Sequence, residues 1–447
     1  MVQEQMLNPI NAMLRGRHLL SWDAVASLTL LFALDLLLLS CISYLWDKIQ
    51  FDEDDWQPPP PFAESVFCIW LHRKKHFGET LDIAGGHCGM PGSVPLEQYN
   101  HLFDNMVRFQ SLRCHDPRDR VFALRAISRD ATEMAIAPDY SIQSTPEHLY
   151  HTITIHYLRA SSKLGVILET ACVWDNESSP SLPSWSFNHR RGPMLTPISG
   201  IPDSLAHPQI PRRSVPRFSC EGMVLTLKGR KVDGIRFASV PVYFTRGMFQ
   251  GIIDKETRQR RAMWLSSLMG AASRLEMSLG TAMAVSRILL LKRVGLETAI
   301  QLWCFLNGEL ACFHKHLDIA EKNVAAFLEI YQRFVQQLAN ILFRDLGLTP
   351  PSPDEAEEHG GSFATRICWR GRSFGISERG MLLNAMNKAQ EGDAVMAFEG
   401  AESLWVLRPA GDHRYRLVGA VWVEGLMSGE AYEGLDPDEV DYDVEIV

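Results

Sequence analysis

The chain has 447 residues, of which 46% are apolar and 22% charged, and this composition is ordinary for a globular protein of several domains. Its formal net charge of -9, without a long basic block, argues against a nucleic-acid-binding surface. The nine cysteines form no CxxC pair and no signal peptide is evident at Met1, which predicts a reducing, cytoplasmic location.

One segment opens a second possibility for location. Residues 24–46 are almost entirely apolar, with Asp35 as the only charge, and are long enough for a helix that crosses a bilayer. A helix buried within a soluble domain is favoured, and a membrane anchor is the alternative. Residues 47–63 follow with an acidic cluster and four consecutive prolines, which predicts a linker.

Residues 64–217 are predicted to form a helical region. Leu96–Leu112 has a helical pattern, and Thr145 followed by Pro146 is typical of the start of another helix. Residues 176–217 are rich in proline, serine, arginine and glycine and have the composition of a surface loop.

The remaining chain predicts a β-rich module with a helical insertion. Met223–Leu227 and Lys231–Phe237 are expected to form a strand pair with a turn between them, within a β segment at 218–240. Residues 241–361 form the insertion, which ends in a boundary loop at 348–361. After residue 361 the apolar residues recur with a period of two, which is typical of strands. Strands are expected at Ser362–Trp369, Arg372–Ile376, Ala394–Glu399, Ser403–Pro409 and Tyr415–Val423.

These elements predict an α+β fold. Its N-terminal and middle regions are mostly helical, and its C-terminal module is an antiparallel partial barrel made of 218–240 and 362–432. The strands at 223–237 should pair with those at 394–423, because a short meander with alternating apolar faces needs a cover. Residues 433–447 are expected to be an acidic tail.

A charged motif precedes the helix that starts at Thr145. Asp116 is suited to cap a helix and Pro117 to its first position. Charges of both signs then occupy the first turn: Arg118, Asp119 and Arg120. A second turn carries the sequence Pro138, Asp139, Tyr140 and Ser141. These residues are expected to hold a helix start and its neighbouring loops in place, not to catalyse.

Together with Trp185 in an LPSW segment, these motifs resemble the pattern of fungal heterokaryon-incompatibility (HET-domain) proteins. The C-terminal part of the chain resembles the closing segment of that family, and its motifs come in the same order. The residues that carry this second match are Gly392, Asp393, Leu407, Arg408, Pro409, Gly419, Gly425, Met427, Gly429 and Glu430.

The front of the chain departs from the family pattern. Residues 2–4, the turn at Gly16 and the apolar segment look like the end of a HET domain, and its opening motifs are absent. Residues 1–46 are therefore interpreted as the remnant of that domain, and the chain as an N-terminally truncated member.

The resemblance implies a role in nonself recognition and programmed cell death in filamentous fungi. It implies action through protein partners, other HET-type proteins among them, without a cofactor. One alternative is the remnant of an NAD-cleaving enzyme of the TIR-like kind, in which Glu4 is the only candidate catalytic residue. The other alternative is a non-functional fragment of a longer HET protein.

No recognised catalytic motif supports the enzyme alternative. The sequence contains no P-loop, GxGxxG, GxSxG or HExxH pattern. Residues 312–316, which read CFHKH, offer metal-ligand types, but no second ligand cluster completes a tetrahedral site. A structural role is the favoured interpretation of this segment.

Overall fold

The structure is a computed structural model, and it divides the chain into two compact units. The first contains Met1–Tyr157 and Asn188–Met194, and the second contains Leu158–Phe187 and Leu195–Val447. The residues that the structure describes are 12–15, 18–21, 101–108, 114–125, 128–160, 164, 182–187, 214–219, 222–239, 255–290, 294–316, 322–366, 372–386, 389–401, 403–427, 429–433, 435–436 and 441–447.

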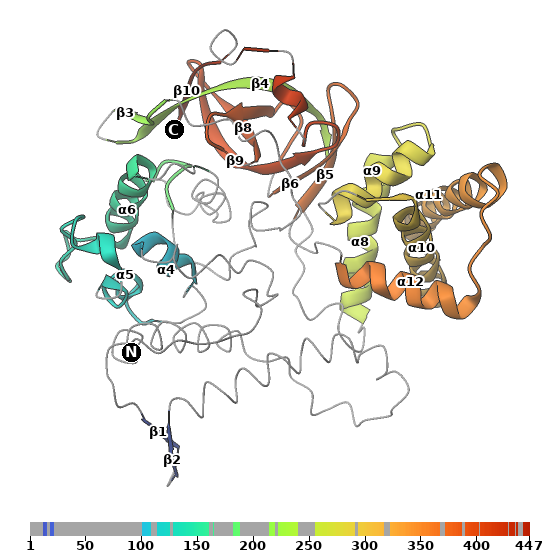
Figure 1. The fold of residues 1–447 in the computed structure, drawn as a ribbon, viewed down its shortest axis with the longest axis horizontal. Coiled ribbons are helices and arrows are strands. Elements are labelled where there is room, and N and C mark those ends of the chain that lie inside the picture. Colours follow the sequence, from blue (N-terminus) through green and yellow to red (C-terminus); the bar gives the residue numbers. More distant parts are fainter. Residues whose placement is uncertain are drawn as a thin grey trace. The chain divides into compact units, whose positions relative to one another are not determined.

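The first unit combines a short hairpin with helices (Figure 1). Strands β1 (Ala12–Arg15) and β2 (His18–Ser21) pair antiparallel, on either side of the expected turn at Gly16. The helices are α4 (Leu102–Arg108), α5 (Asp119–Phe122), the 3-10 helix η4 (Arg129–Ala131) and α6 (Pro146–Ala160). Helix α6 begins at Pro146, directly after Thr145, as the sequence predicts.

Buried side chains join these helices into a small core. Phe103 of α4, Val121 of α5 and Tyr150 of α6 are all buried. The buried carboxylate of Asp130 accepts a hydrogen bond from the backbone N–H of Leu102 at 2.7 Å, so η4 caps the start of α4. This core provides the rigid base for the charged motif described below.

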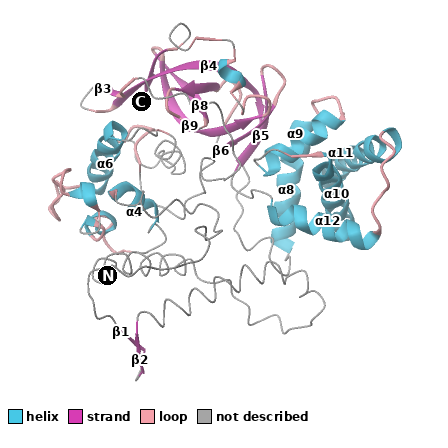
Figure 2. Ribbon diagram, viewed as in Figure 1, coloured by secondary structure: helices cyan, strands magenta, loops and turns pink. Residues whose placement is uncertain are grey.

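The second unit contains an eight-stranded sheet that curls into a partial ring (Figures 1 and 2). Its strands are β3 (Arg217–Ser219), β4 (Val224–Ala238), β5 (Arg372–Ser377), β6 (Leu382–Met386), β7 (Ala394–Phe398), β8 (Leu404–Gly411), β9 (Arg414–Val423) and β10 (Tyr442–Ile446). The sheet order is β10-β4-β5-β6-β9-β8-β7, and β7 pairs back onto β4.

The long strand β4 closes this ring because it takes partners on both edges. At Gly229 it pairs both with Phe398 of β7 and with Tyr442 of β10, so these two strands lie on opposite edges of β4. Further along, Ile235–Ala238 pairs with β5. The expected pairing of 223–237 with the strands of 394–423 is confirmed, as is the α+β class with an antiparallel partial barrel.

A group of helices lies between β4 and β5 in the chain, where the sequence predicts an insertion (Figure 1). Its members are α8 (Lys255–Ala272), α9 (Leu279–Leu290), α10 (Leu296–His316), α11 (Lys322–Ala339), the π-helix η8 (Asn340–Asp345) and α12 (Pro353–Arg366). An aromatic pair and a hydrogen bond are among the contacts that hold the group against the sheet. Trp264 of α8 packs edge-on against Phe374 of β5, and the buried Asn384 of β6 donates to the carbonyl of Ile288 at 2.7 Å.

The structure corrects several expected elements. Residues 223–237 do not form a strand pair, because the stretch 228–230 continues a single strand in which both edges are hydrogen-bonded. The expected strand at Ser362–Trp369 and the expected loop at 348–361 are wrong, since Pro353–Arg366 is the helix α12. Strand β6 was not expected, and the supposed acidic tail contains β10.

Helix α12 has a recognisable N-terminal signal that a loop interpretation overlooks. Ser352 and Glu355 form a reciprocal capping box, in which Glu355 accepts from the Ser352 N–H and hydroxyl at 2.8 Å each. The prolines before it are therefore compatible with a helix start.

Across the described ranges, none of the helices is both long and apolar enough to cross a membrane. The apolar segment 24–46, the linker 47–63 and Glu4 lie outside these ranges.

Candidate functional site

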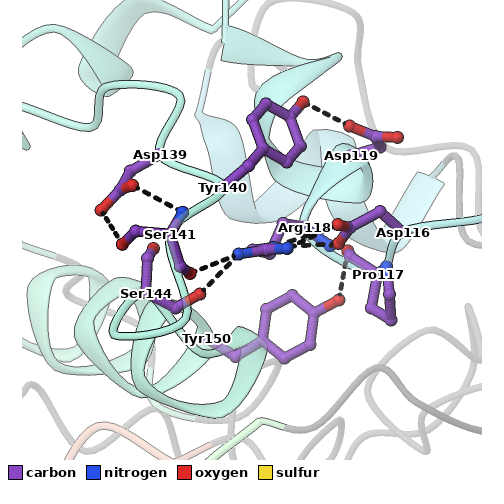
Figure 3. Close-up of polar contacts among 9 residues, drawn as sticks. All are labelled: Asp116, Pro117, Arg118, Asp119, Asp139, Tyr140, Ser141, Ser144 and Tyr150. Carbon is purple, nitrogen blue, oxygen red and sulfur yellow. Dashed lines mark hydrogen bonds and ion pairs between the residues drawn. The ribbon is translucent and has the colours of Figure 1, made fainter.

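The charged motif forms a tight turn that leads into α5 (Figure 3). Asp116 accepts the backbone N–H of Arg118 at 2.9 Å, and its carbonyl accepts the N–H of Asp119 at 3.0 Å. The helix itself starts two residues later than expected, at Asp119, and its N-cap residue Arg118 makes no side-chain cap. Asp116 therefore caps the preceding turn, in which Pro117 fits because the turn needs no N–H from that position.

Arg118 joins this turn to the second motif (Figure 3). Its Nε and Nη2 form a bidentate pair with the Asp116 carboxylate at 3.0 and 2.7 Å. Its Nη1 donates to the carbonyls of Ser141 and Ser144 at 2.9 and 3.0 Å. One guanidinium thus fixes the backbone of residues 141–144 against α5, more than twenty positions earlier in the chain.

Tyr140 makes a second connection between the two motifs. Its hydroxyl donates to Oδ1 of Asp119 at 2.6 Å, and its ring packs edge-on against Phe122. The guanidinium of Arg118 lies 5.2 Å from the centre of the same ring, a cation-π distance. The hydrogen bond to Asp119 raises the pKa of Tyr140, because the phenol proton is shared with a carboxylate.

The loop also stabilises itself. Asp139 accepts the Ser141 N–H at 2.9 Å and its hydroxyl at 3.1 Å, which closes an Asx turn. These bonds lower the pKa of Asp139, just as the bonds from Arg118 lower the pKa of Asp116. Below, Tyr150 donates its hydroxyl to the carbonyl of Pro117 at 2.7 Å.

Although its backbone is held in this way, the loop presents apolar side chains to solvent. Tyr140 is 54% exposed and Ile142 is 93% exposed. Residues 139–144 are hereafter called the motif loop. Pro138 is exposed directly before it, and Arg120 lies on α5 next to Cys114.

In the barrel, two of the closing motifs form one contact. Asp393 is only 1% exposed, and Arg408 of β8 binds it in a bidentate pair at 2.9 and 3.1 Å. Asp393 also accepts the N–H of Gln390 at 2.9 Å. The ion pair therefore attaches the turn before β7 to strand β8. Gly392 lies in this turn with a positive φ of 88°, a conformation that favours glycine. This contact is structural in kind.

The other closing residues occupy strands and turns of the same module. Leu407 is buried in β8, Pro409 pairs with Tyr415, and Gly419 of β9 is buried opposite Val406. Gly425 and Gly429 have positive φ in turns, Met427 is buried with its sulfur near the N–H of Val423, and Glu430 starts the 3-10 helix η9 (Glu430–Tyr432).

Ser184, which sequence reasoning did not single out beside Trp185, binds two segments that are distant in the chain. Its hydroxyl accepts the N–H of Leu417 at 2.8 Å, and both its N–H and its hydroxyl contact the carbonyl of Val447. Trp185 is fully buried and packs against Phe218 of β3. No local signal shows that Ser184 meets residues 233 and 263 positions away.

The metal-ligand candidates at 312–316 lie in the last turns of α10. Within the part of the chain that the structure describes, no group of three potential metal ligands comes together.

Among the residues that the sequence singled out, the structure brings together Asp116 with Arg118, Asp119 with Tyr140, and Asp393 with Arg408.

Comparison with known proteins gives one matching family model and one similar curated protein. Residues 355–439 match the family model described as the Het-6 beta-barrel domain, which covers α12 and most of the barrel strands. The chain is also 23% identical over 388 residues to heterokaryon incompatibility protein 6, OR allele, of Neurospora crassa. That alignment covers 77% of this chain and 53% of the relative, so the chain spans about half the length of the curated protein that it matches. No solved structure matches the chain.

Proposed function

Because this chain belongs to the fungal heterokaryon-incompatibility protein family, we propose that it acts in nonself recognition leading to programmed cell death, through contacts with protein partners. Its location in this proposal is the cytoplasm. The partners are other proteins of the incompatibility system, HET-type proteins among them.

The motif loop is the observation that supports this proposal. A loop that is fixed before binding loses little conformational entropy when a partner docks. Arg118, Asp139 and Tyr140 fix it through the bonds described above, while Ile142 stays almost fully exposed. Complete burial of an isoleucine side chain contributes about 1.5–3 kcal/mol, enough to change affinity by roughly tenfold or more.

The composition of the loop also suits an interface better than a catalytic centre. Tyrosine is enriched at binding hot spots, and the phenol of Tyr140 is held in one orientation by Asp119. Asp116 and Asp139 both have a lowered pKa, and hydrogen bonds from Arg118 and Ser141 occupy their carboxylates. They are therefore poor candidates for proton transfer near neutral pH.

The test is an incompatibility assay in a filamentous fungus, with cell death scored by a vital dye after fusion with an incompatible strain. The variant Ile142→Asp should abolish the reaction while its melting temperature stays unchanged. The matched control is Val215→Asp, which charges another apolar residue that is 70% exposed but lies beside β3. It should leave the reaction intact. A full reaction with Ile142→Asp would show that the motif loop is not the interface.

The same assay separates the alternatives. A non-functional fragment would give no cell death even with the unaltered chain. An NAD-cleaving remnant would give cell death that is insensitive to Ile142→Asp, together with release of nicotinamide from NAD.

Location needs an experiment of its own, because the segment 24–46 lies outside the described residues. Carbonate extraction of fungal membranes should leave the chain in the soluble fraction. Recovery in the membrane pellet, lost when residues 24–46 are deleted, would instead identify a membrane anchor.

A further inference from the structure

Strand β10 fills a gap in the barrel between two strands that are distant in the chain. It pairs antiparallel with β4, from Tyr442 opposite Gly229 to Ile446 opposite Leu225. On its other edge it pairs parallel with β9, where Ile446 lies opposite Tyr415. Val444 and Ile446 are buried, Glu445 between them is half-buried, and Asp443 before them is exposed. The strand therefore closes the sheet through pairing on both of its edges and through the buried side chains of Val444 and Ile446.

The end of this strand is held by the LPSW segment. Val447 donates its N–H to the carbonyl of Tyr415 at 2.8 Å. Its carbonyl accepts from the N–H of Ser184 at 3.2 Å and contacts the Ser184 hydroxyl. Because that hydroxyl also accepts from Leu417, Ser184 bridges β9 and the last residue of the strand.

The start of the strand is held by a buried carboxylate. Asp441 is 9% exposed, and its Oδ2 accepts from the hydroxyl of Tyr432 at 3.3 Å. Its other oxygen, Oδ1, is buried and has no hydrogen-bond partner among the described residues. A buried acceptor without a donor strongly disfavours the charged form of a carboxylate.

The charged groups around Asp441 come from β4 and from the residue that follows β7. Glu399, after β7, is a second buried carboxylate and repels its negative charge. Arg230 and Lys228 of β4 attract it, but Arg230 also lies over the ring of Tyr432, at 5.6 Å. Burial is the largest effect, and together these raise the pKa of Asp441 to about 6.

We propose that β10 is a strap that detaches from the barrel when Asp441 loses its proton, so that mild acid holds the strap closed. In the docked strap the neutral carboxyl is favoured by burial and by Glu399. In the detached strap the side chain returns to water and ionises at its ordinary pKa. Detachment is therefore coupled to release of a proton, and every rise in pH between the two pKa values favours it.

The direction of the pH effect on the docked strap follows from the linkage between protonation and stability. A raised pKa in the docked state adds stability that is complete below the ordinary aspartate pKa of 3.8 and is lost as the pH rises to about 6. Detachment would uncover the edge of β4 at residues 225–229 and that of β9 at 414–415. Unpaired edges of this kind accept extended segments of other chains, which gives the strap a means of controlling association.

Hydrogen exchange of the full-length chain, followed by mass spectrometry, tests the strap. With a pKa of about 6 when docked and about 3.8 when detached, the detached population should be about tenfold larger at pH 7.5 than at pH 5. Exchange in residues 442–446, corrected for the intrinsic effect of pH, should rise by that factor. Exchange in β7 should not change, because β7 is not part of the strap.

Two variants on either side of Tyr442 give the decisive comparison. Asp441→Asn removes the titrating group and should make exchange in the strap independent of pH. Asp443→Asn changes an exposed aspartate on the same strand, which pairs with Arg217 on the outer face, and should keep the tenfold dependence. Equal exchange of the unaltered strap at both pH values would overturn the proposal. So would a pH dependence that survives in Asp441→Asn or that extends to β7.

Discussion

Arg118 illustrates how single residues of the two motifs work together. It binds one carboxylate and two carbonyl groups at the same time, and a planar guanidinium can do so where a point-like ammonium cannot. These partners are the Asp116 carboxylate and two backbone carbonyls, and the nearby negative charge of Asp139 also favours the guanidinium. The motif residues therefore act as pairs, so the loss of one partner should have an effect that the bonds of the pair predict.

Replacement of Arg118 by lysine should release the motif loop without unfolding the unit. Lysine cannot reach Asp116, Ser141 and Ser144 at once, so the loop loses the connection to α5. Limited proteolysis should cut within residues 139–144 faster than in the unaltered chain. Arg129→Lys, an exposed arginine of the same unit, is the control and should leave the cleavage rate unchanged. Equal cleavage in Arg118→Lys would mean that the clamp does not order the loop.

The acid response of the motif should have the opposite sign to that of the strap. Hydrogen bonds from Arg118 hold the pKa of Asp116 below its ordinary value of 3.8. A lowered pKa gives stability that is present above 3.8 and is lost as the pH falls through the folded value. The melting temperature of the chain should exceed that of Asp116→Asn at pH 6, and the difference should disappear as the pH falls through the lowered pKa of Asp116. A difference that persists in strong acid would show that charge is not its cause.

The barrel offers a comparison between a buried and an exposed ion pair. Arg408→Ala leaves Asp393 buried without its bidentate partner, which should cost about 1–3 kcal/mol once the partial exposure of Arg408 is considered. Arg414→Ala removes a pair with Glu445 in which both side chains are over 40% exposed, and should cost less than about 1 kcal/mol. Urea unfolding measures both values, and equal costs would contradict the role assigned to Asp393.

At the scale of elements, helices α10 and α12 approach closely because α12 has a glycine where they touch. A Cβ atom on Gly360 would lie 3.3 Å from backbone atoms of Cys304 and Phe305. The next residue, Gly361, has open space at the same position. Two adjacent glycines of one helix thus differ only in what surrounds them.

This difference makes a direct test of helix packing. Gly361→Ala should raise the free energy of unfolding by about 0.5–1 kcal/mol, because alanine favours helix without meeting another atom. Gly360→Ala gains the same propensity but pushes against the backbone of α10, and should be at least about 1 kcal/mol less stable than Gly361→Ala. Urea unfolding of the two variants should show this order. The reverse order would mean that the two helices separate easily.

At the scale of the molecule, the described strands do not have the arrangement that holds a nucleotide in a doubly wound fold. Such folds bind it at the carboxyl ends of parallel strands, where the strand order reverses. In the described sheet the pairings are antiparallel except for β10 with β9.

The corresponding prediction is that the purified chain does not cleave NAD. Incubation with NAD should release no more nicotinamide than a heat-treated control does. Turnover above that control, abolished by Glu4→Ala, would establish the enzyme alternative instead.

The sequence by itself determined those features that depend on local patterns. Thr145 and Pro146 start α6 because a capping hydroxyl and a proline suit a first helical turn wherever they occur. The alternation of apolar residues in 394–423 is a property of each strand, and it predicted the antiparallel module and its need for the strand at 223–237. The pairing of one motif with another did not follow from local patterns, because Arg118 meets Ser141 and Ser144, and Arg408 meets Asp393, only in the folded chain.

Only the tertiary structure decided what depends on partners far along the chain. Residues 228–230 look like a turn, but they remain strand because β7 and β10 bind both edges of β4, where a Cβ on Gly229 would collide with the carbonyl of Ala397. Ser362 has a strand-like neighbourhood, yet it is helical because α12 packs on α10. Ser184 meets Val447 across 263 residues. A local pattern determines which conformations have a low free energy, whereas burial and long-range hydrogen bonds select among them.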